Sequence, residues 1–331
     1  MIKIGINGFG RIGRVCMRIL LESNDFEVVA INDPVTTDNL CYLLNFDSHY
    51  GRIPEFEAQD DFLIRGDVKI PIRHEMDISE VDWNGATIVI DASGVTDNIY
   101  NARNLPENIT SIVTHSPSNG VDSYIVMGIN DNEYDASHKV ISSSICDVNG
   151  AAQVIKPIDD KYGIENGFVT TLHPWLSYQN LIDGPVANQS NPGHSWPDYS
   201  LGRSSVGTMI PKNTSLIPAL DNVIPNISKR VDAISFRTPT SIVSSADMTL
   251  TLKSDFEVEE VTEFLRGLRS EYIKVNEQHL VGMDYLAMNE AVAIDLQWVR
   301  KIGSMLHLVI WYDNEWSYCS NTVKLARKVG S

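Results

Sequence analysis

The sequence predicts an α/β protein of two domains: a Rossmann-type domain with a largely parallel sheet, and a catalytic domain with a mostly antiparallel or mixed sheet. Three observations support this. The 331 residues exceed what one ordinary core holds. The first half alternates short apolar runs with helical patterns, and a glycine-rich turn follows the first run. The second half has longer strand patterns with few helices between them.

The elements of the first half follow one another as strands and helices. Apolar runs that predict strands occupy 2–6, 26–33, 86–94, 111–118, 123–130 and 138–144. Between the first two runs lies the amphipathic segment RIGRVCMRILLES, and after the second comes TDNLCYLLNF, both with helical periodicity. Strands that alternate with helices indicate βαβ units, so this half is expected to be the parallel domain.

The second half changes in character from about residue 165. Strand patterns, several of them alternating or Thr-rich, occupy 167–174, 232–239, 241–252 and 305–313, and 257–272 is an amphipathic helix. We expect domains at 1–145, completed by a C-terminal helix over 314–331, and at 146–313, the catalytic and oligomerisation domain. The long Gly-, Pro- and Asn-rich segment 181–205 is typical of a functional or interface loop.

Composition limits the possible partners. The formal net charge of −17 disfavours nucleic acid and anionic membranes, although a local site can still attract a small anion. The four cysteines lie far apart in the chain, without disulfide or metal-ligand spacing, so we expect reduced thiols, no metal site and a cytoplasmic location. We expect no signal peptide, and no apolar run reaches the length of a membrane span.

The glycine pattern Gly8-x-Gly10-x-x-Gly13 follows the first strand and opens the first helix. In a dinucleotide site, the first glycine permits a tight turn, the second lets the backbone approach a pyrophosphate, and the third allows close packing of helix on strand. The helix N-terminus then supplies N–H donors to the phosphates. The alternative is a glycine turn without a ligand.

Asp33 ends the second strand, twenty residues after Gly13. A carboxylate there accepts hydrogen bonds from both ribose hydroxyls and repels a 2′-phosphate, so the sequence predicts NAD rather than NADP as the cofactor. The alternative is that Asp33 only caps a helix before Pro34.

Cys146 lies in the run SSSICDVNG, directly before Asp147. A thiolate is the reactive form of cysteine, and a neighbouring carboxylate makes it harder to form. A lone cysteine, or a lone histidine such as His173, is more often a core residue than a catalyst. The residues alone therefore leave the role of both open.

The chain resembles the glyceraldehyde-3-phosphate dehydrogenases along essentially its whole length, as a divergent member of the NAD-dependent type I family. The resemblance rests on motifs in the family's order and spacing: INGFGRIGR, AINDP, SGV, HSPS, the cysteine, TTLHP, FRTPT and WYDNEWSY. It implies a Rossmann-type NAD domain, a catalytic domain, a homotetramer, and a subunit-interface loop around 176–201 near the cofactor.

The resemblance also implies site residues. Cys146 falls on the nucleophile and His173 on the base, with Thr214 and Arg237 on anion-binding positions. The positions that match the family's NAD contacts are the three glycines, Arg11 and Ile12 at the pyrophosphate, Asp33 at the ribose, Ser93, Gly94 and Ser116 in the cofactor cleft, Asn314 at the nicotinamide carboxamide and Tyr318 near its ring.

The sequence departs from the family at both anion sites. Ile145 and Asp147 replace the two hydroxyl residues that flank the nucleophile and help to hold inorganic phosphate. A carboxylate within about 4 Å of a phosphate repels it by roughly 1–4 kcal/mol. On the substrate-phosphate side, a threonine and an acid have become Leu176 and Tyr178. The arginine often found in the interface loop has become Ser200. An arginine of the adenine region has become Met76.

Three functions remain open at this point. The first is NAD-dependent oxidation of a small phosphorylated or otherwise anionic aldehyde through a Cys146 thioester, without inorganic phosphate as the acyl acceptor. In this reaction Asp147 either orients water or binds a cationic group of the substrate. The second is ordinary phosphorylating glyceraldehyde-3-phosphate dehydrogenase, with Asp147 only a helix cap. The third is a non-catalytic paralogue that binds NAD. Retention of both Cys146 and His173 argues against the third.

Overall fold

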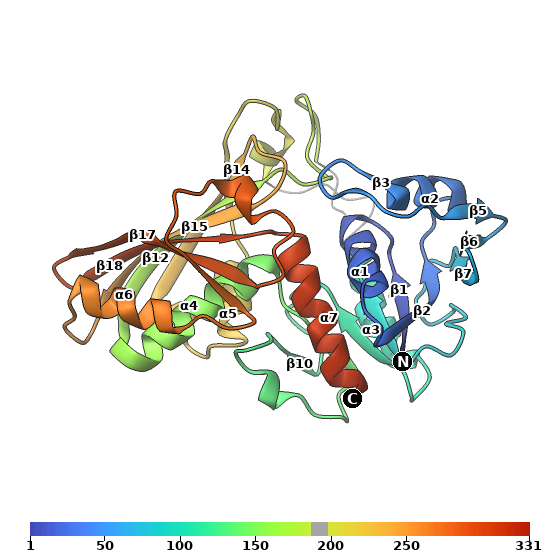
Figure 1. Ribbon diagram of the computed structural model, residues 1–331, viewed down its shortest axis with the longest axis horizontal. Coiled ribbons are helices and arrows are strands. Elements are labelled where there is room, and N and C mark those ends of the chain that lie inside the picture. Colours follow the sequence, from blue (N-terminus) through green and yellow to red (C-terminus); the bar gives the residue numbers. More distant parts are fainter. Residues whose placement is uncertain (187–197) are drawn as a thin grey trace. The chain divides into compact units, whose positions relative to one another are not determined.

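The computed structural model describes residues 1–186 and 198–331 (Figure 1). They form two compact units. The first comprises Met1–Ile125, Asp131–Ser144 and Thr322–Ser331, and the second comprises Val126–Asn130 and Ile145–Asn321. The chain thus passes from the first unit to the second between Ser144 and Ile145, and the first unit resumes at Thr322.

The first unit is built on a nine-stranded sheet. Its order is β10 (Ser123–Tyr124), β11 (Val140–Ser142), β9 (Thr110–Val113), β8 (Ile88–Asp91), β1 (Ile2–Asn7), β2 (Phe26–Asn32), β7 (Val68–Arg73), β6 (Phe62–Arg65), β5 (Glu57–Gln59). All pairs from β10 to β7 are parallel, and β6 and β5 add an antiparallel edge. The helices are α1 (Arg11–Leu21), α2 (Thr37–Asn45) and α3 (Thr96–Asn101), with a small hairpin of β3 (Phe46–Asp47) and β4 (Gly51–Arg52).

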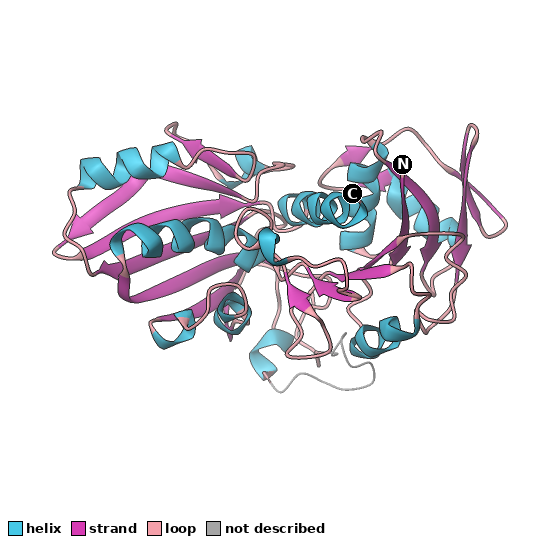
Figure 2. Cartoon of the chain, turned by 90° about the horizontal axis from the view of Figure 1, so that it is seen from below, coloured by secondary structure: helices cyan, strands magenta, loops and turns pink. Residues whose placement is uncertain are grey.

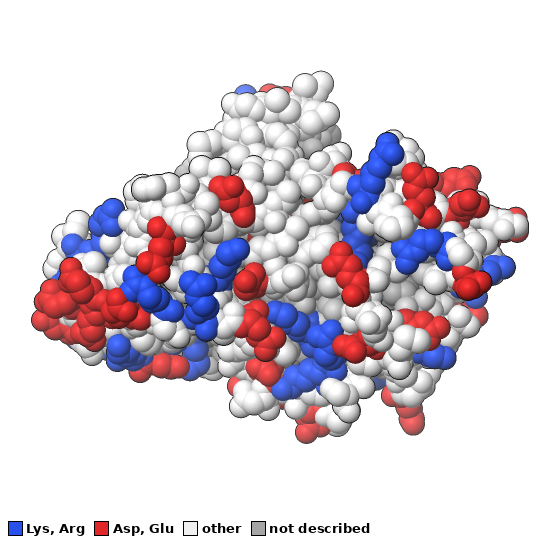
Figure 3. Space-filling model, in the orientation of Figure 1, with Lys and Arg blue, Asp and Glu red and all other residues white. Residues whose placement is uncertain are grey.

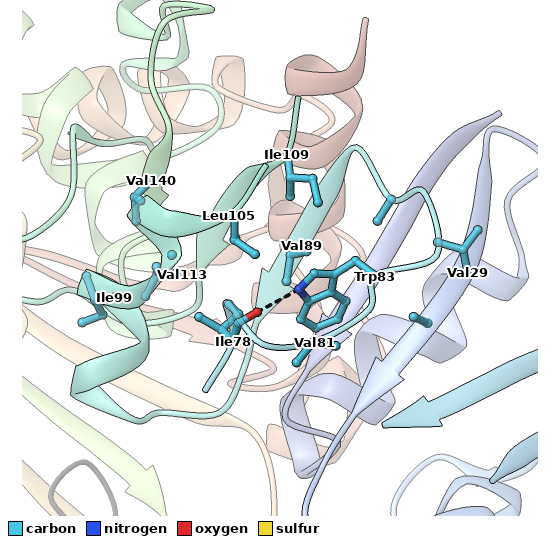
Figure 4. Close-up of a cluster of buried hydrophobic side chains, with 13 residues drawn as sticks. Val29, Ile78, Val81, Trp83, Val89, Ile99, Leu105, Ile109, Val113 and Val140 are labelled. Carbon is cyan, nitrogen blue, oxygen red and sulfur yellow. Dashed lines mark hydrogen bonds between the residues drawn. The ribbon is translucent and has the colours of Figure 1, made fainter. Parts of the chain in front are cut away.

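A hydrophobic cluster on this sheet contains Trp83 (Figure 4). The buried indole N–H donates to the Ile78 carbonyl over 3.0 Å, which satisfies the one polar atom of the ring. Gly5 of β1 makes room for the ring, because a Cβ there would lie 2.4 Å from Trp83. This packing fixes β1, and β1 carries the glycine turn at its end.

The second unit is built on a seven-stranded mixed sheet. Its order is β13 (Ile210–Asn213), β14 (Val231–Thr238), β12 (Ile164–Pro174), β15 (Ser244–Leu252), β18 (Met305–Tyr312), β17 (Val292–Ile302), β16 (Ile273–Asn276). The pairs β12–β14 and β16–β17 are parallel and the others antiparallel. The helices are α4 (Cys146–Tyr162), α5 (Leu216–Asp221) and α6 (Val258–Gly267), and α7 (Trp316–Gly330) follows β18.

The two faces of this sheet differ in their covering. On one face lie Thr171 and His173 of β12, opposite Ser235 and Arg237 of β14, and the Thr171 hydroxyl donates to that of Ser235 over 2.8 Å. Helix α4 packs against β12, β17 and β18 (Figure 2). The side chains of its first two residues contact His173 and Tyr312 of this face. The opposite face exposes apolar side chains, among them Phe168, Ile234 and Met305.

The predicted fold class is confirmed: a largely parallel Rossmann-type sheet and a second, mixed sheet.

On the face that Figure 3 shows, acidic side chains gather most densely over α6, whose exposed residues include Glu259, Glu260 and Glu263. Among the helices of the described residues, none combines the length and apolarity that a bilayer crossing requires.

Candidate functional site

The glycine turn has the geometry that the sequence predicts. Gly8 has φ +83°, and a Cβ there would lie 2.5 Å from the Ser93 backbone. A Cβ on Gly13 would lie 2.1 Å from the Gly8 carbonyl oxygen, so only glycine lets α1 approach β1 this closely. Among residues 1–186 and 198–331, no atom would lie within 4 Å of a Cβ on Gly10. In this part of the chain, nothing fills the space beside Gly10 at the N-terminus of α1, where a pyrophosphate would fit.

Side chains brace this turn from both sides. Asp33 is half-buried, and its carboxylate accepts the backbone N–H of Phe9 over 2.7 Å and that of Val35 over 2.9 Å. Arg14 donates to the Phe9 carbonyl over 2.8 Å, and the Arg11 guanidinium pairs with Asp47 over 2.5 Å. The carboxylate of Asp33 is thus held directly beside the glycine turn, as a ribose-binding acid must be.

The other predicted cofactor residues divide between the two units. In the first unit, Ser93 donates to the buried carboxylate of Asp91 over 2.6 Å, Gly94 follows with φ +70°, and Ser116 is half-buried. In the second unit, Asn314 and Tyr318 are buried. The side-chain oxygen of Asn314 has no hydrogen-bond partner in the described chain. A buried acceptor without a partner is costly, so this oxygen fits an amide donor such as a nicotinamide carboxamide.

The candidate catalytic residues meet where α4 begins. The Cys146 S–H donates to Asp147 Oδ1 over 3.6 Å, and Sγ lies 3.7 Å from His173 Nε2. Cys146 is half-buried, whereas the side chains of Asp147 and His173 are buried. We call these three residues the thiol cluster.

His173 is oriented by its own backbone neighbour. Its Nδ1 lies 2.8 Å from the Pro174 carbonyl, and a carbonyl only accepts, so Nδ1 carries the proton and Nε2 presents a lone pair to the thiol. Burial and the nearby Arg237 lower the pKa of His173 to about 4, against a smaller opposing effect of Asp147. The imidazole is therefore neutral at physiological pH and available to accept a proton.

The thiol itself is disfavoured as an anion. Loss of hydration and then the Asp147 carboxylate raise the pKa of Cys146 well above its ordinary value, and the Arg237 charge opposes them only in part. Before a substrate binds, Cys146 is therefore protonated and donates to Asp147.

Asp147 is fixed by Tyr312. The Tyr312 hydroxyl donates to Asp147 Oδ1 over 2.7 Å in the interior, and no side-chain cap bonds the N-terminus of α4. Gly150 permits this approach, because a Cβ there would lie 3.1 Å from the Tyr312 ring. The hydrogen bonds of Asp147 thus go to a phenol and a thiol and not to the helix backbone.

Two cations lie near the thiol cluster. Arg237 is buried on β14, and its Nη2 lies 3.2 Å from the Tyr178 hydroxyl. Lys212 of β13 lies opposite Ser235, and its side chain faces the same side of the sheet as Arg237. Burial and the Arg237 charge lower the pKa of Lys212 to about 8, while Asp147, Asp198 and Cys146 oppose them.

The remaining predicted positions have local structural partners. Thr214 accepts the Leu216 N–H over 3.1 Å ahead of α5, Ser200 donates its hydroxyl to Asp198 over 2.6 Å, and Met76 is exposed. Residues 187–197 of the predicted interface loop lie outside the described part of the chain.

The donor atoms of the thiol cluster lie within 4.8 Å of one another, which is close enough for a metal ion. The positive charges of Arg237 and Lys212 next to the cluster disfavour a dication there, so we assign no metal to it.

Tyr312 and Lys212 were missed in the sequence. Tyr312 belongs to the motif WYDNEWSY, in which the resemblance assigned roles only to Asn314 and Tyr318. Lys212 lies two residues before Thr214, which was assigned an anion-binding role. The period-2 alternation of a strand puts Lys212 and Thr214 on the same face, which was the one available signal. In the structure, Lys212 lies opposite Ser235, two residues before Arg237. The register that reveals this comes only with the fold.

Comparison with known proteins adds independent evidence for the family. Residues 2–99 match the family model described as "Glyceraldehyde 3-phosphate dehydrogenase, NAD binding domain", and residues 145–314 match the C-terminal domain of the same enzyme. A cytosolic glyceraldehyde-3-phosphate dehydrogenase of Chlamydomonas reinhardtii is 35% identical over 344 residues, covering 99% of this chain and 96% of the relative.

Two further relatives give similar values. The Atriplex nummularia enzyme is 32% identical, covering 98% of this chain and 91% of the relative, and enzyme 3 of Saccharomyces cerevisiae is 32% identical, covering 99% of each. Both family domains and the full length are thus matched. The chain belongs to the glyceraldehyde-3-phosphate dehydrogenase family of NAD-dependent oxidoreductases.

Proposed function

We propose that this enzyme oxidises a small anionic aldehyde through a thioester on Cys146 and releases the product without inorganic phosphate. One observation carries the proposal: the Cys146 thiol lies between a neutral imidazole at 3.7 Å and a buried carboxylate at 3.6 Å. The first group suits aldehyde oxidation. The second disfavours phosphate at the position where the acyl group must be released.

The cofactor is NAD, and the residues that would hold it fit it chemically. Gly8, Gly10 and Gly13 with the backbone of Arg11 and Ile12 would receive the pyrophosphate, and Asp33 the ribose. Ser93, Gly94 and Ser116 would line the cleft, and Asn314 and Tyr318 would receive the nicotinamide. Bound NAD⁺ supplies the hydride acceptor.

The oxidation assigns one task to each residue of the pair. Cys146 Sγ forms a bond to the aldehyde carbon as its thiol proton leaves, and the former carbonyl oxygen becomes a hydroxyl. As hydride departs from that carbon, His173 Nε2 takes the hydroxyl proton, and the carbon–oxygen double bond re-forms as a thioester. The neutral state of His173, whose pKa is lowered to about 4, is the state that this step requires.

Release of the acyl group is the task that we assign to Asp147. Its carboxylate is held by Tyr312 and lies beside the sulfur that carries the acyl group. There it orients a water molecule and accepts its proton as the water oxygen attacks the thioester carbon. The carbon–sulfur bond breaks, the sulfur takes up a proton, and a carboxylic acid leaves.

We also propose a cytoplasmic homotetramer, in keeping with the family. The apolar residues Phe168, Ile234 and Met305 lie on the sheet face opposite α4 and are exposed in the single chain, as a subunit interface would require. The net charge of −17 supports a small-molecule substrate and neither nucleic acid nor a membrane as partner.

The test is NADH formation with glyceraldehyde 3-phosphate and with other small aldehydes, followed by intact-protein mass spectrometry of the quenched enzyme. We expect NADH and an acyl adduct that maps to Cys146. Absence of NADH with every aldehyde, despite NAD binding, would support the non-catalytic alternative instead.

A further inference from the structure

Lys212 is a cation of the second unit to which the oxidation steps give no task. Strand β13 pairs antiparallel with β14, so that Lys212 lies opposite Ser235 and Ile210 lies opposite Arg237. Opposite residues of an antiparallel pair present their side chains on the same face. That face is marked by the Thr171–Ser235 hydrogen bond, and it is the face on which His173 approaches Cys146.

The two cations lie close enough to influence each other, and neither has an anionic contact. Among the described residues, the Lys212 side chain forms no hydrogen bond or ion pair, and the Arg237 side chain forms none with a carboxylate. The buried Nε of Arg237 has no partner either. Two positive charges beside each other repel, and an anion between them would relieve the repulsion and satisfy the unused donors.

The neighbouring changes in sequence alter the set of residues around Arg237. Leu176 and Tyr178 have replaced two hydrogen-bonding residues on the substrate side, and the Tyr178 hydroxyl occupies one Nη of Arg237. Lys212 adds a second positive charge from the neighbouring strand β13, on the same face of the sheet.

We propose that Lys212 and Arg237 together bind an oxyanion of the aldehyde substrate, either a carboxylate or a phosphate group, which makes Lys212 a specificity-determining residue. The inference deepens the proposed function and rests on it. A neutral aldehyde would form the same thioester but would gain nothing from Lys212.

The lysine gives this binding a pH dependence. Its pKa is lowered to about 8, so the free enzyme loses the positive charge above that pH and should bind the anion less well. The groups that face it and enter this balance are Arg237 of β14, His173 of β12, Cys146 and Asp147 of α4, and Asp198. An arginine at position 212 would stay charged and remove this alkaline loss.

The experiment compares Lys212→Met, Lys212→Arg and the native enzyme on matched aldehydes. Glyceraldehyde 3-phosphate is paired with glyceraldehyde, and succinic semialdehyde with butanal, each with and without inorganic phosphate. Lys229→Met is the control, because Lys229 is an exposed lysine of the same unit. For the methionine variant we expect KM to rise at least about tenfold for an anionic aldehyde, the size of one lost charge-assisted hydrogen bond.

The matched pairs identify the oxyanion. If the KM of Lys212→Met rises only for glyceraldehyde 3-phosphate, the bound oxyanion is a phosphate. If it rises only for succinic semialdehyde, the oxyanion is a carboxylate. For either, Lys212→Arg should restore KM and abolish its rise above pH 8, and Lys229→Met should change nothing. Three results would overturn the proposal: an equal rise in KM for the neutral aldehydes, no rise in KM for any aldehyde, or a change only in the response to inorganic phosphate.

A second readout needs no turnover. Cys146 is half-buried and the other three cysteines are buried, so alkylation by iodoacetamide should report on Cys146. Glycerol 3-phosphate or succinate should protect it in the native enzyme and at least about tenfold less well in Lys212→Met. If protection depends on Lys212 although no aldehyde is oxidised, the proposed function fails and the anion site stands. Protection that is equal in both proteins contradicts the anion site itself.

Discussion

The glycine turn and the thiol cluster differ in how far they keep the family pattern. At the turn, Gly8, Gly13 and Asp33 are all retained, and each has the geometry that a dinucleotide requires. At the cluster, Cys146 and His173 are retained, but a carboxylate held by Tyr312 lies beside the sulfur. Under the proposed function, the contrast separates two parts of the reaction: the residues assigned to hydride removal match the family, whereas those assigned to anion binding and acyl release differ from it.

The largest effect should follow from removing the nucleophile. We expect Cys146→Ser to reduce NADH formation at least about a thousandfold, because a serine hydroxyl is far less acidic and nucleophilic than a thiol. NAD affinity, measured by calorimetry, should stay within about twofold, since Cys146 belongs to none of the predicted cofactor contacts. Substantial turnover by the serine variant would remove Cys146 from the mechanism.

Two substitutions at the glycine turn separate the residue required for packing from the residue required for NAD binding. Gly13→Ala forces a methyl group to within 2.1 Å of the Gly8 carbonyl, so we expect it to destabilise the fold by roughly 1–3 kcal/mol. The Gly10→Ala methyl group meets nothing among the described residues, so this variant should leave the melting temperature unchanged while weakening NAD binding. If Gly10→Ala leaves NAD affinity intact, the pyrophosphate does not approach this residue.

The turn could be predicted from the sequence because its physics is local. Gly8 and Gly13 are required by one backbone angle and by one close contact between neighbouring elements, and both are set by the spacing of three glycines. The thiol cluster depends on contacts between residues far apart in the chain. Family resemblance supplied Cys146 and His173 as a pair, while the residues alone left both undecided.

Tyr312 and Lys212 could not be assigned because each acts through strand register. Tyr312 reaches Asp147 only because α4 packs against β18 and Gly150 leaves space for the ring. Lys212 lies near Arg237 only because β13 pairs with β14 in a register that sets Lys212 opposite Ser235, two residues before Arg237. Asp147 stood out in the sequence, but its partner Tyr312 could not be known before the fold.

The charge of Asp147 should be visible in the titration of the thiol. Because the carboxylate raises the pKa of Cys146, Asp147→Asn should lower that pKa while its side-chain oxygen still accepts from Tyr312. The rate of alkylation by iodoacetamide rises with the thiolate fraction, so its midpoint should move to lower pH. An unmoved midpoint would mean that the carboxylate does not act on the sulfur.

A smaller effect is expected at the ribose. Asp33→Ala should narrow the preference for NAD over NADP by about tenfold, because it removes repulsion of a 2′-phosphate. The ratio of kcat/KM for the two cofactors measures this. Equal efficiency of both cofactors in the unmodified enzyme would show that Asp33 does not face the ribose.

The most direct test of the remodelled acyl-release step is a titration of the native enzyme with inorganic phosphate at saturating aldehyde and NAD. We expect the rate of NADH formation to stay flat and the product to be a carboxylic acid, because the Asp147 carboxylate repels phosphate beside the thioester. Asp147→Thr should introduce a phosphate dependence. Saturation of the native rate with phosphate, together with accumulation of an acyl phosphate, would contradict the account and restore the ordinary phosphorylating reaction.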